Sequence, residues 1–313
     1  MRLAIIGCGN IARQHVIPMQ NAGFKIVGIA GRLGGSKSLD LFSSDFNLKN
    51  LYKDPQELLN SRDWDALLLS CPTKDMLTYL KSSMNINKPI LIEKPITYNY
   101  KDLIPYQSKE NLCVGLNRRF YKTISKAKNF VTNNQNIFIK VTIPETLKEL
   151  DINKNGKIPN KTFENSIHIF DALVYLVGEI KWLNVNKIYE NKNLKAISAI
   201  GSSNKCQIIQ LNNYYNNSDN FSIEILSDKK RLLLKPLEIS YLFDGMTVKE
   251  PSKDSPLRTY HPKLKEKFIE TNEFKPGFKG QANEFMKFCK NKKVKIAKIK
   301  DLYTSLKLID DLN

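Results

Sequence analysis

The amino-terminal turn constrains the fold more than any other part of the sequence. Met1–Ile6 is a short apolar run typical of a buried strand, and helical spacing follows over Ile11–Ala22. The residues between and at the start of this helix read Gly7, Cys8, Gly9, Asn10, Ile11 and Ala12. In such a Gly-x-Gly-x-x-Ala turn, the first glycine permits the tight turn, the second lets a pyrophosphate approach the backbone, and the third small residue keeps the helix close to the strand. The N–H groups and dipole at the helix start favour phosphate, so the pattern predicts dinucleotide binding.

Strand and helix signals alternate through the first third of the chain. Further strands are expected at Phe24–Ala30, Ala66–Ser70, Pro89–Glu93 and Leu112–Leu116, with a helix over Thr73–Met84. Strands separated by helices need right-handed crossovers and form a parallel sheet. We therefore expect residues 1–119 to form an α/β domain of the Rossmann type, with a doubly wound parallel sheet.

The rhythm changes after Tyr121. A helix over Lys122–Thr132 and a strand over Ile137–Ile143 lead to a polar loop at Asn153–Asn160 and a helix from about Phe163 to Val177. Six or so strands then follow one another between Lys181 and Val248, before helices at Gln281–Lys290 and Asp301–Leu312. Consecutive strands without helices predict an antiparallel sheet. Residues 120–313 are thus expected to form an α+β domain with an open, mostly antiparallel sheet.

Charge and composition exclude several classes of protein. The formal net charge is +18, but the basic residues are 41 Lys and eight Arg spread along the whole chain, so we expect no nucleic-acid partner and only electrostatic steering of anionic small molecules. No apolar run approaches the ~20 residues of a membrane helix, and no signal peptide is recognisable, which predicts a cytoplasmic protein without a membrane partner. Five scattered cysteines and three histidines predict neither a disulfide framework nor a metal site.

Two strand ends carry candidate cofactor residues. Gly31 and Arg32 follow the second strand, where Asp or Glu would select NAD and an Arg accommodates the 2′-phosphate of NADP. NADP is therefore expected to be preferred over NAD, although a solvated basic loop is the alternative. Glu93, Lys94 and Pro95 follow the strand at Ile90–Ile92. A partly desolvated Lys94 near a nicotinamide can exchange a proton with a substrate hydroxyl. Cys71 and Pro72, at the end of another strand, are assigned to the same cofactor site.

Four segments occur in the order seen in one enzyme family. They are the glycine turn, Glu93-Lys94-Pro95, Val114–Phe120 and Ile167–Asp171. In this order they resemble the Gfo/Idh/MocA oxidoreductases, and the resemblance extends over nearly the whole chain. It implies a Rossmann domain that binds NAD or NADP and a second domain for substrate binding and oligomerisation, with a homodimer or homotetramer formed through the carboxy-terminal sheet.

The resemblance also assigns roles to individual residues. Lys94 matches the family's catalytic lysine and His168 its second acid/base, while Glu93 matches the nicotinamide side of the cleft. The sugar pocket is assigned to Asn117, Arg118, Asn165 and Asp171. The chain departs from the pattern at Met76, where the family has a histidine, and at Glu164, where it often has Asp or Asn. Because Glu164, His168, Asp171 and Tyr175 recur at helical spacing, Glu164 is expected to orient His168 from one turn earlier.

The expected reaction is reversible hydride transfer between a nicotinamide and a secondary alcohol or ketone of a sugar, inositol or sugar nucleotide. Two alternatives stay open. One is reduction of a non-sugar C=O or C=N bond, and the other is a catalytically silent, cofactor-binding regulatory protein of the same fold.

Overall fold

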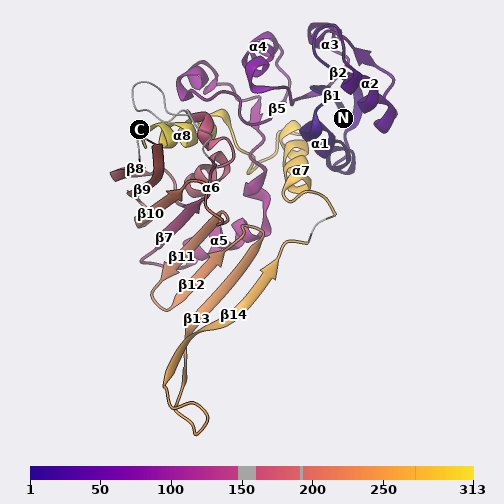
Figure 1. Ribbon diagram of the computed structural model, residues 1–313. Coiled ribbons are helices and arrows are strands. Elements are labelled where there is room, and N and C mark those ends of the chain that lie inside the picture. Colours follow the sequence, from indigo (N-terminus) through magenta and orange to yellow (C-terminus); the bar gives the residue numbers. More distant parts are fainter. Residues whose placement is uncertain (147–159, 191–192, 272) are drawn as a thin grey trace. The chain divides into compact units, whose positions relative to one another are not determined.

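The computed structural model describes residues 1–146, 160–190, 193–271 and 273–313 (Figure 1). The chain divides into two compact units, the first made of Met1–Phe120 with Asn272–Lys307 and the second of Tyr121–Thr271 with Leu308–Asn313. The first break therefore falls one residue after the expected one. Most of the polar loop predicted at Asn153–Asn160 lies outside the described residues.

The first unit is built on a six-stranded sheet in the order β3-β2-β1-β4-β5-β6, and every recorded pairing in it is parallel. Its strands are β1 (Arg2–Ile6), β2 (Lys25–Ala30), β3 (Leu51–Tyr52), β4 (Ala66–Leu69), β5 (Ile90–Ile92) and β6 (Leu112–Val114). Its helices are α1 (Asn10–Asn21), α2 (Lys37–Phe46), α3 (Pro55–Ser61), α4 (Thr73–Ser83) and α7 (Phe278–Cys289), with 3₁₀ turns η1 (Tyr100–Tyr106) and η2 (Asn117–Phe120). The strand order reverses between β1 and β4, which is the topological switch point where open α/β sheets bind ligands.

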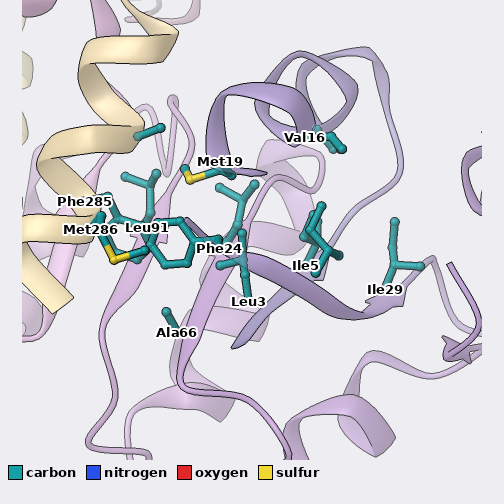
Figure 2. Packing of buried hydrophobic residues seen from close by; sticks show 14 of the residues in the cluster. Leu3, Ile5, Val16, Met19, Phe24, Ile29, Ala66, Leu91, Phe285 and Met286 are labelled. Atoms are coloured by element: carbon teal, nitrogen blue, oxygen red, sulfur yellow. The ribbon is translucent and has the colours of Figure 1, made fainter. Parts of the chain in front are cut away.

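Helix α7 belongs to this first unit, whereas the sequence predicts it in the second domain. Its side chains Phe285 and Met286 lie in the same buried cluster as Leu3 of β1 and Met19 of α1 (Figure 2). The ring of Phe285 stacks on that of Phe24 with centroids 5.5 Å apart. Burial of this apolar surface, rather than position along the chain, determines which unit the segment joins.

The second unit contains an eight-stranded sheet in the order β14-β13-β12-β11-β7-β10-β9-β8. The strands are β7 (Phe138–Ile143), β8 (Lys181–Glu190), β9 (Asn193–Ser203), β10 (Cys206–Tyr214), β11 (Ser222–Ser227), β12 (Lys230–Leu234), β13 (Ile239–Lys249) and β14 (Thr259–Ile269). Among the strands that the structure describes in this second sheet, only β7 and β10 pair in parallel, so the expectation of a mostly antiparallel sheet is confirmed. Strands β13 and β14 continue as a long hairpin beyond the rest of this sheet (Figure 1).

Side chains alternate between the two faces of this second sheet. Ile139, Val141 and Ile143 of β7 are buried, as are Ile209 and Leu211 of β10. The unit also contains α5 (Lys122–Asn133) and α6 (Ile167–Val177), which contact each other. The last helix, α8 (Ile299–Asp310), runs from residues of the first unit into the carboxy-terminal residues of the second.

Helix α6 begins later than the sequence predicts. Residues Asn160–Phe163 form a 3₁₀ turn, η3, and the helix starts at Ile167 after a turn that contains Glu164. Phe163 is nevertheless buried, with its ring edge-on to Phe170 at a centroid distance of 5.9 Å. The spacing of apolar residues therefore indicates which side of this segment is buried, but it does not indicate that the segment is one continuous helix. Glu164 therefore lies in the turn before α6 and not within the helix that carries His168.

Membrane-spanning character is not found in the helices of the described ranges, since none is both long and apolar enough to cross a bilayer.

Candidate cofactor-binding and catalytic site

A cavity of about 800 Å³ lies in the first unit at the carboxyl ends of β1, β2, β4 and β5. Of the residues predicted to bind the cofactor, all except Ala12 line it: Gly7, Gly9, Asn10, Ile11, Gly31, Arg32, Cys71, Pro72, Glu93 and Lys94. Ala12 is fully buried in the core of the unit, as expected of the small residue that keeps helix and strand close. The sheet thus gathers residues from four separate stretches of sequence around one space.

The glycine turn is shaped for an anionic group. Gly7 has φ = 108°, and a Cβ on it would lie 2.2 Å from the carbonyl oxygen of Ser70, so no other residue fits there. Gly9 is the N-cap of α1, and a Cβ built on it would meet nothing within 4 Å. The helix has no side-chain cap and no acidic residue in its first turn. Its first N–H groups therefore face open space at a positive dipole end, which fits a pyrophosphate.

The end of β2 presents cationic and hydroxyl groups to the cavity. Arg32 is exposed, and its Nε donates a hydrogen bond to the carbonyl oxygen of Gly35 at 3.4 Å. Ser36 caps α2 by accepting from the Leu39 N–H at 3.3 Å, and Lys37 follows it on the cavity wall. The carboxylates among the described lining residues, Asp75 and Glu93, come from other elements.

Glu93 and Lys94 follow β5, whose end is fixed by a hydrogen bond from the Glu93 N–H to the Leu69 carbonyl oxygen at 2.8 Å. Lys94 is partly buried and lines the cavity. The Glu93 side chain is buried, with Oε1 2.6 Å from Nε2 of His15 and Oε2 accepting from the Lys94 N–H at 3.2 Å. Sequence reasoning missed His15, although its place on the apolar face of α1 beside Ala12 and Val16 was a usable signal.

Cys71 and Met76 occupy the part of the site where the family pattern has a histidine. Met76 is buried, and the Cys71 thiol donates to its sulfur at 3.6 Å. Burial, followed by the negative charge of Asp75, raises the pKa of the Cys71 thiol to about 12. The same two causes raise the pKa of Tyr79 on α4. Cys71, Met76 and Tyr79 therefore bring no titrating histidine to this wall, and the charges beside them are those of Lys74 and Asp75.

Two predicted sugar-pocket residues lie in η2 of the first unit. Asn117 is buried, and its Nδ2 donates to the carbonyl oxygen of Pro276 at 2.9 Å, which ties η2 to the segment before α7. Arg118 is half-buried, while the neighbouring buried Arg119 forms an ion pair at 3.3 Å with Asp301, which is half-buried. The Asn117 amide thus has a structural partner.

The other predicted residues belong to the second unit. His168 and Asp171 are buried on α6, Asn165 is exposed and Glu164 is half-buried in the preceding turn. Ser166 is the N-cap residue before α6, and its N–H donates to Oε1 of the buried Glu145 at 2.8 Å while its hydroxyl donates to the same oxygen. Glu145 lies two residues after the end of β7, so the carboxyl end of that strand meets the start of α6.

Further buried polar groups on β10 and just beyond it were missed by sequence reasoning. Asn213 pairs with Ile143 of β7 and is 1% exposed, and Tyr215 follows two residues later at 3%. The amide of Asn213 and the hydroxyl of Tyr215 form no hydrogen bond with any described residue. Burial, followed by the charge of Glu145, raises the pKa of Tyr215. Buried polar groups usually have partners, so this end of the sheet is a candidate ligand surface that only strand pairing could reveal.

The chain combines a Rossmann unit, which holds a cavity at its glycine turn, with a second unit built on a mostly antiparallel sheet. Residues 1–109 match the Gfo/Idh/MocA family, described as an oxidoreductase family with an NAD-binding Rossmann fold. This match covers the part of the chain that carries the glycine turn and Glu93-Lys94-Pro95.

Known proteins resemble the chain over different lengths. Myo-inositol 2-dehydrogenase of Thermotoga maritima is 24% identical over 215 residues, a match that spans 65% of this chain and 61% of that enzyme. A dehydrogenase from Clostridium difficile superposes with a TM-score of 0.74 at 19% identity, covering 99% of this chain and 97% of that one. An oxidoreductase from Agrobacterium radiobacter, solved in complex with NAD⁺, L-tartaric acid and magnesium, gives a TM-score of 0.75 at 13% identity over 99% and 94% of the two chains. These structures share the fold of this chain.

Proposed function

We propose that the protein is a nicotinamide-dependent oxidoreductase that interconverts a secondary alcohol and a ketone on a sugar, inositol or sugar nucleotide. The observation that carries this proposal is the cavity at the switch point of the parallel sheet, which brings the glycine turn and Lys94 to one space. Similarity to myo-inositol 2-dehydrogenase over part of the chain supports a polyol-like substrate.

The cavity fits a dinucleotide at both ends. Gly7, Gly9 and the start of α1 would hold the pyrophosphate, and Arg32 and Lys37 would hold a 2′-phosphate, which favours NADP over NAD. When bound, the nicotinamide supplies the hydride acceptor or donor.

We assign to Lys94 the transfer of the proton to and from the substrate hydroxyl, since an amine in a partly buried site can act as general base and acid near neutral pH. His168 is assigned as the second acid/base, with Glu164 close to it in sequence, in the turn before α6. Substrate hydroxyls are assigned to Asn117, Arg118, Asn165 and Asp171, together with Asn213 and Tyr215, whose polar atoms have no partner among the described residues.

The test is a Lys94→Ala variant measured in single turnover with a panel of sugars, inositols and nucleotide sugars. Cofactor affinity should stay near that of the wild type, while the chemical step should slow by about 10²–10⁴-fold, which is the usual contribution of a general acid–base group. Lys74→Ala is the matched control, because Lys74 carries the same charge, lines the same cavity and is exposed. Equal rates for the two variants would remove Lys94 from the mechanism.

The two alternatives give different results in the same assay. A regulatory protein binds the cofactor tightly and turns over no member of the panel. A reductase of non-sugar C=O or C=N bonds turns over only carbonyl or imine substrates outside the carbohydrate panel.

A further inference from the structure

A buried His–Glu pair in the first unit borders the cofactor cavity, which Glu93 helps to line. His15 of α1 is 0% exposed and Glu93 is 6% exposed, and His15 Nε2 lies 2.6 Å from Glu93 Oε1. The two residues are 78 positions apart in sequence. His15 also packs against the ring of Phe278 on α7, with centroids 4.7 Å apart.

The pair fixes one tautomer of the histidine. A carboxylate oxygen can only accept, so Nε2 carries the proton that is shared with Glu93. Nδ1 of His15 is buried and forms no hydrogen bond with any described residue. Among the described residues, Glu93 is therefore the only one that forms a hydrogen bond with the His15 imidazole.

The carboxylate of Glu93 is held on three sides. Oε1 faces His15, Oε2 accepts from the Lys94 N–H at 3.2 Å, and the backbone of Gly115 lies so close that a Cβ there would be 2.5 Å from Oε1. A buried carboxylate that loses a hydrogen-bond partner destabilises the folded state, so the Glu93 side chain has little freedom to move away from these contacts. Its second oxygen contacts the backbone of the residue that we assign to proton transfer.

We propose that His15 and Glu93 are positioning residues for Lys94. Through their hydrogen bonds they link the helix that begins at the phosphate-binding turn to the peptide that carries the lysine. His15 lies in the second turn of α1, five residues after Asn10, so a shift of this helix is passed to Lys94 through one buried contact. This inference rests on the proposed function of Lys94.

Three variants separate positioning from mere stability. His15→Leu removes the donor to Glu93 but fills the space, and His15→Gln returns an N–H donor at a similar reach. Val16→Ala is the control, since Val16 is the buried neighbour of His15 on α1 and loses core packing only. Each folded variant is measured for cofactor affinity, single-turnover rate and the rate at which the Lys94 amine is reductively methylated, followed by peptide mass analysis with and without NADPH.

Under the proposal, His15→Leu keeps cofactor affinity within about threefold but slows the chemical step by about tenfold to a hundredfold, as expected when a reacting group is misplaced. His15→Gln recovers most of this rate, and Val16→Ala stays close to the wild type. The methylation rate of Lys94, and its protection by NADPH, change in His15→Leu and not in Val16→Ala.

The proposal is overturned if His15→Leu and Val16→Ala lose rate equally, or if His15→Gln brings no recovery. Failure of the proposed function is distinguishable, because it appears as a wild type without turnover. The methylation measurement then still tests whether His15 and Glu93 position Lys94. An unchanged Lys94 reactivity in His15→Leu would mean that they do not.

Discussion

Arg32 is the residue on which the proposed preference for NADP depends most directly. It follows β2 at the position where an acidic residue would bind the ribose of NAD, and the described lining residues next to it are Gly31, Leu33, Ser36 and Lys37. The sequence predicted this arrangement because the position depends only on where a strand ends. A charge-assisted contact with the 2′-phosphate contributes about 1.5–3 kcal/mol.

Arg32→Ala should therefore lose about tenfold to a hundredfold in NADPH affinity and little in NADH affinity. Fluorescence titration with both cofactors measures the two dissociation constants. Lys25→Ala removes the same charge from the amino end of the same strand, where the side chain is exposed, and should change neither constant beyond a small general electrostatic effect. A preference for NADPH that survives in Arg32→Ala would contradict the assignment.

Cys71 gives a residue-scale test of the electrostatics of the cavity. Its pKa is raised to about 12, first by burial and then by Asp75, so the thiol is protonated at neutral pH and the reactive thiolate is scarce. Alkylation of Cys71 by iodoacetamide should be slow at pH 8 and rise about tenfold for each pH unit up to pH 10. Peptide mass analysis measures this rate, and the urea-unfolded chain is the control. A rate that levels off near pH 9 in the native protein would show an ordinary thiol.

At the scale of elements, the start of α6 depends on a contact that the sequence does not display. Apolar periodicity placed the helix start near Phe163, whereas the helix begins at Ile167 after Ser166 binds the carboxylate of Glu145. Glu145 and Ser166 are 21 residues apart, and their contact exists only because β7 ends beside α6. Local spacing cannot predict such a cap.

Ser166→Ala should destabilise the second unit by about 1–3 kcal/mol, because the buried Glu145 carboxylate loses a hydroxyl donor. Denaturant unfolding followed by circular dichroism measures the loss, and amide hydrogen exchange over 167–177 should show weaker protection. Ser125→Ala is the matched control, since Ser125 is exposed in the first turn of α5, and its effect should stay within about 0.5 kcal/mol. Equal stabilities for the two variants would mean that the Glu145 contact does not stabilise the helix.

At the scale of the whole molecule, the uncovered face of the second sheet predicts self-association. Ile200 and Ile208 are 44% and 48% exposed on neighbouring strands β9 and β10, and Tyr214 on β10 is 59% exposed. Ile200 pairs with Gln210, two residues from Ile208, so both isoleucines point to the same face. An exposed apolar patch of this kind is typical of a protein–protein interface.

We expect a homodimer or homotetramer formed through this face, with a mass in sedimentation equilibrium that is a multiple of the chain mass. The double variant Ile200→Lys/Ile208→Lys should weaken the association by about tenfold or more, because both ammonium groups would have to be desolvated. Ile17→Lys on α1, at 40% exposure, is the control with the same chemistry in the first unit. An unchanged mass in the double variant would exclude this face as the interface.

The sequence by itself determined the features that depend on local geometry and on burial period. The glycine turn, the parallel sheet of the first unit, the strand-end position of Lys94 and the mostly antiparallel second sheet all follow from patterns within 5 to 15 or so neighbouring residues. It did not reveal β3, which has only two residues, or β14, whose mostly exposed side chains carry no apolar alternation. Strands of these kinds are held by pairing with a neighbour and not by their own pattern.

Only the tertiary structure decided which distant residues meet. It placed α7 in the first unit, joined His15 to Glu93 across 78 positions, and set Glu145 at the start of α6. It also buried Asn213 and Tyr215 at the carboxyl end of a parallel strand pair. Each of these contacts is stabilised by burial and hydrogen bonds between segments that lie far apart in the sequence and share no sequence pattern. Local patterns could not predict them, because they arise only when the folded chain packs these segments together.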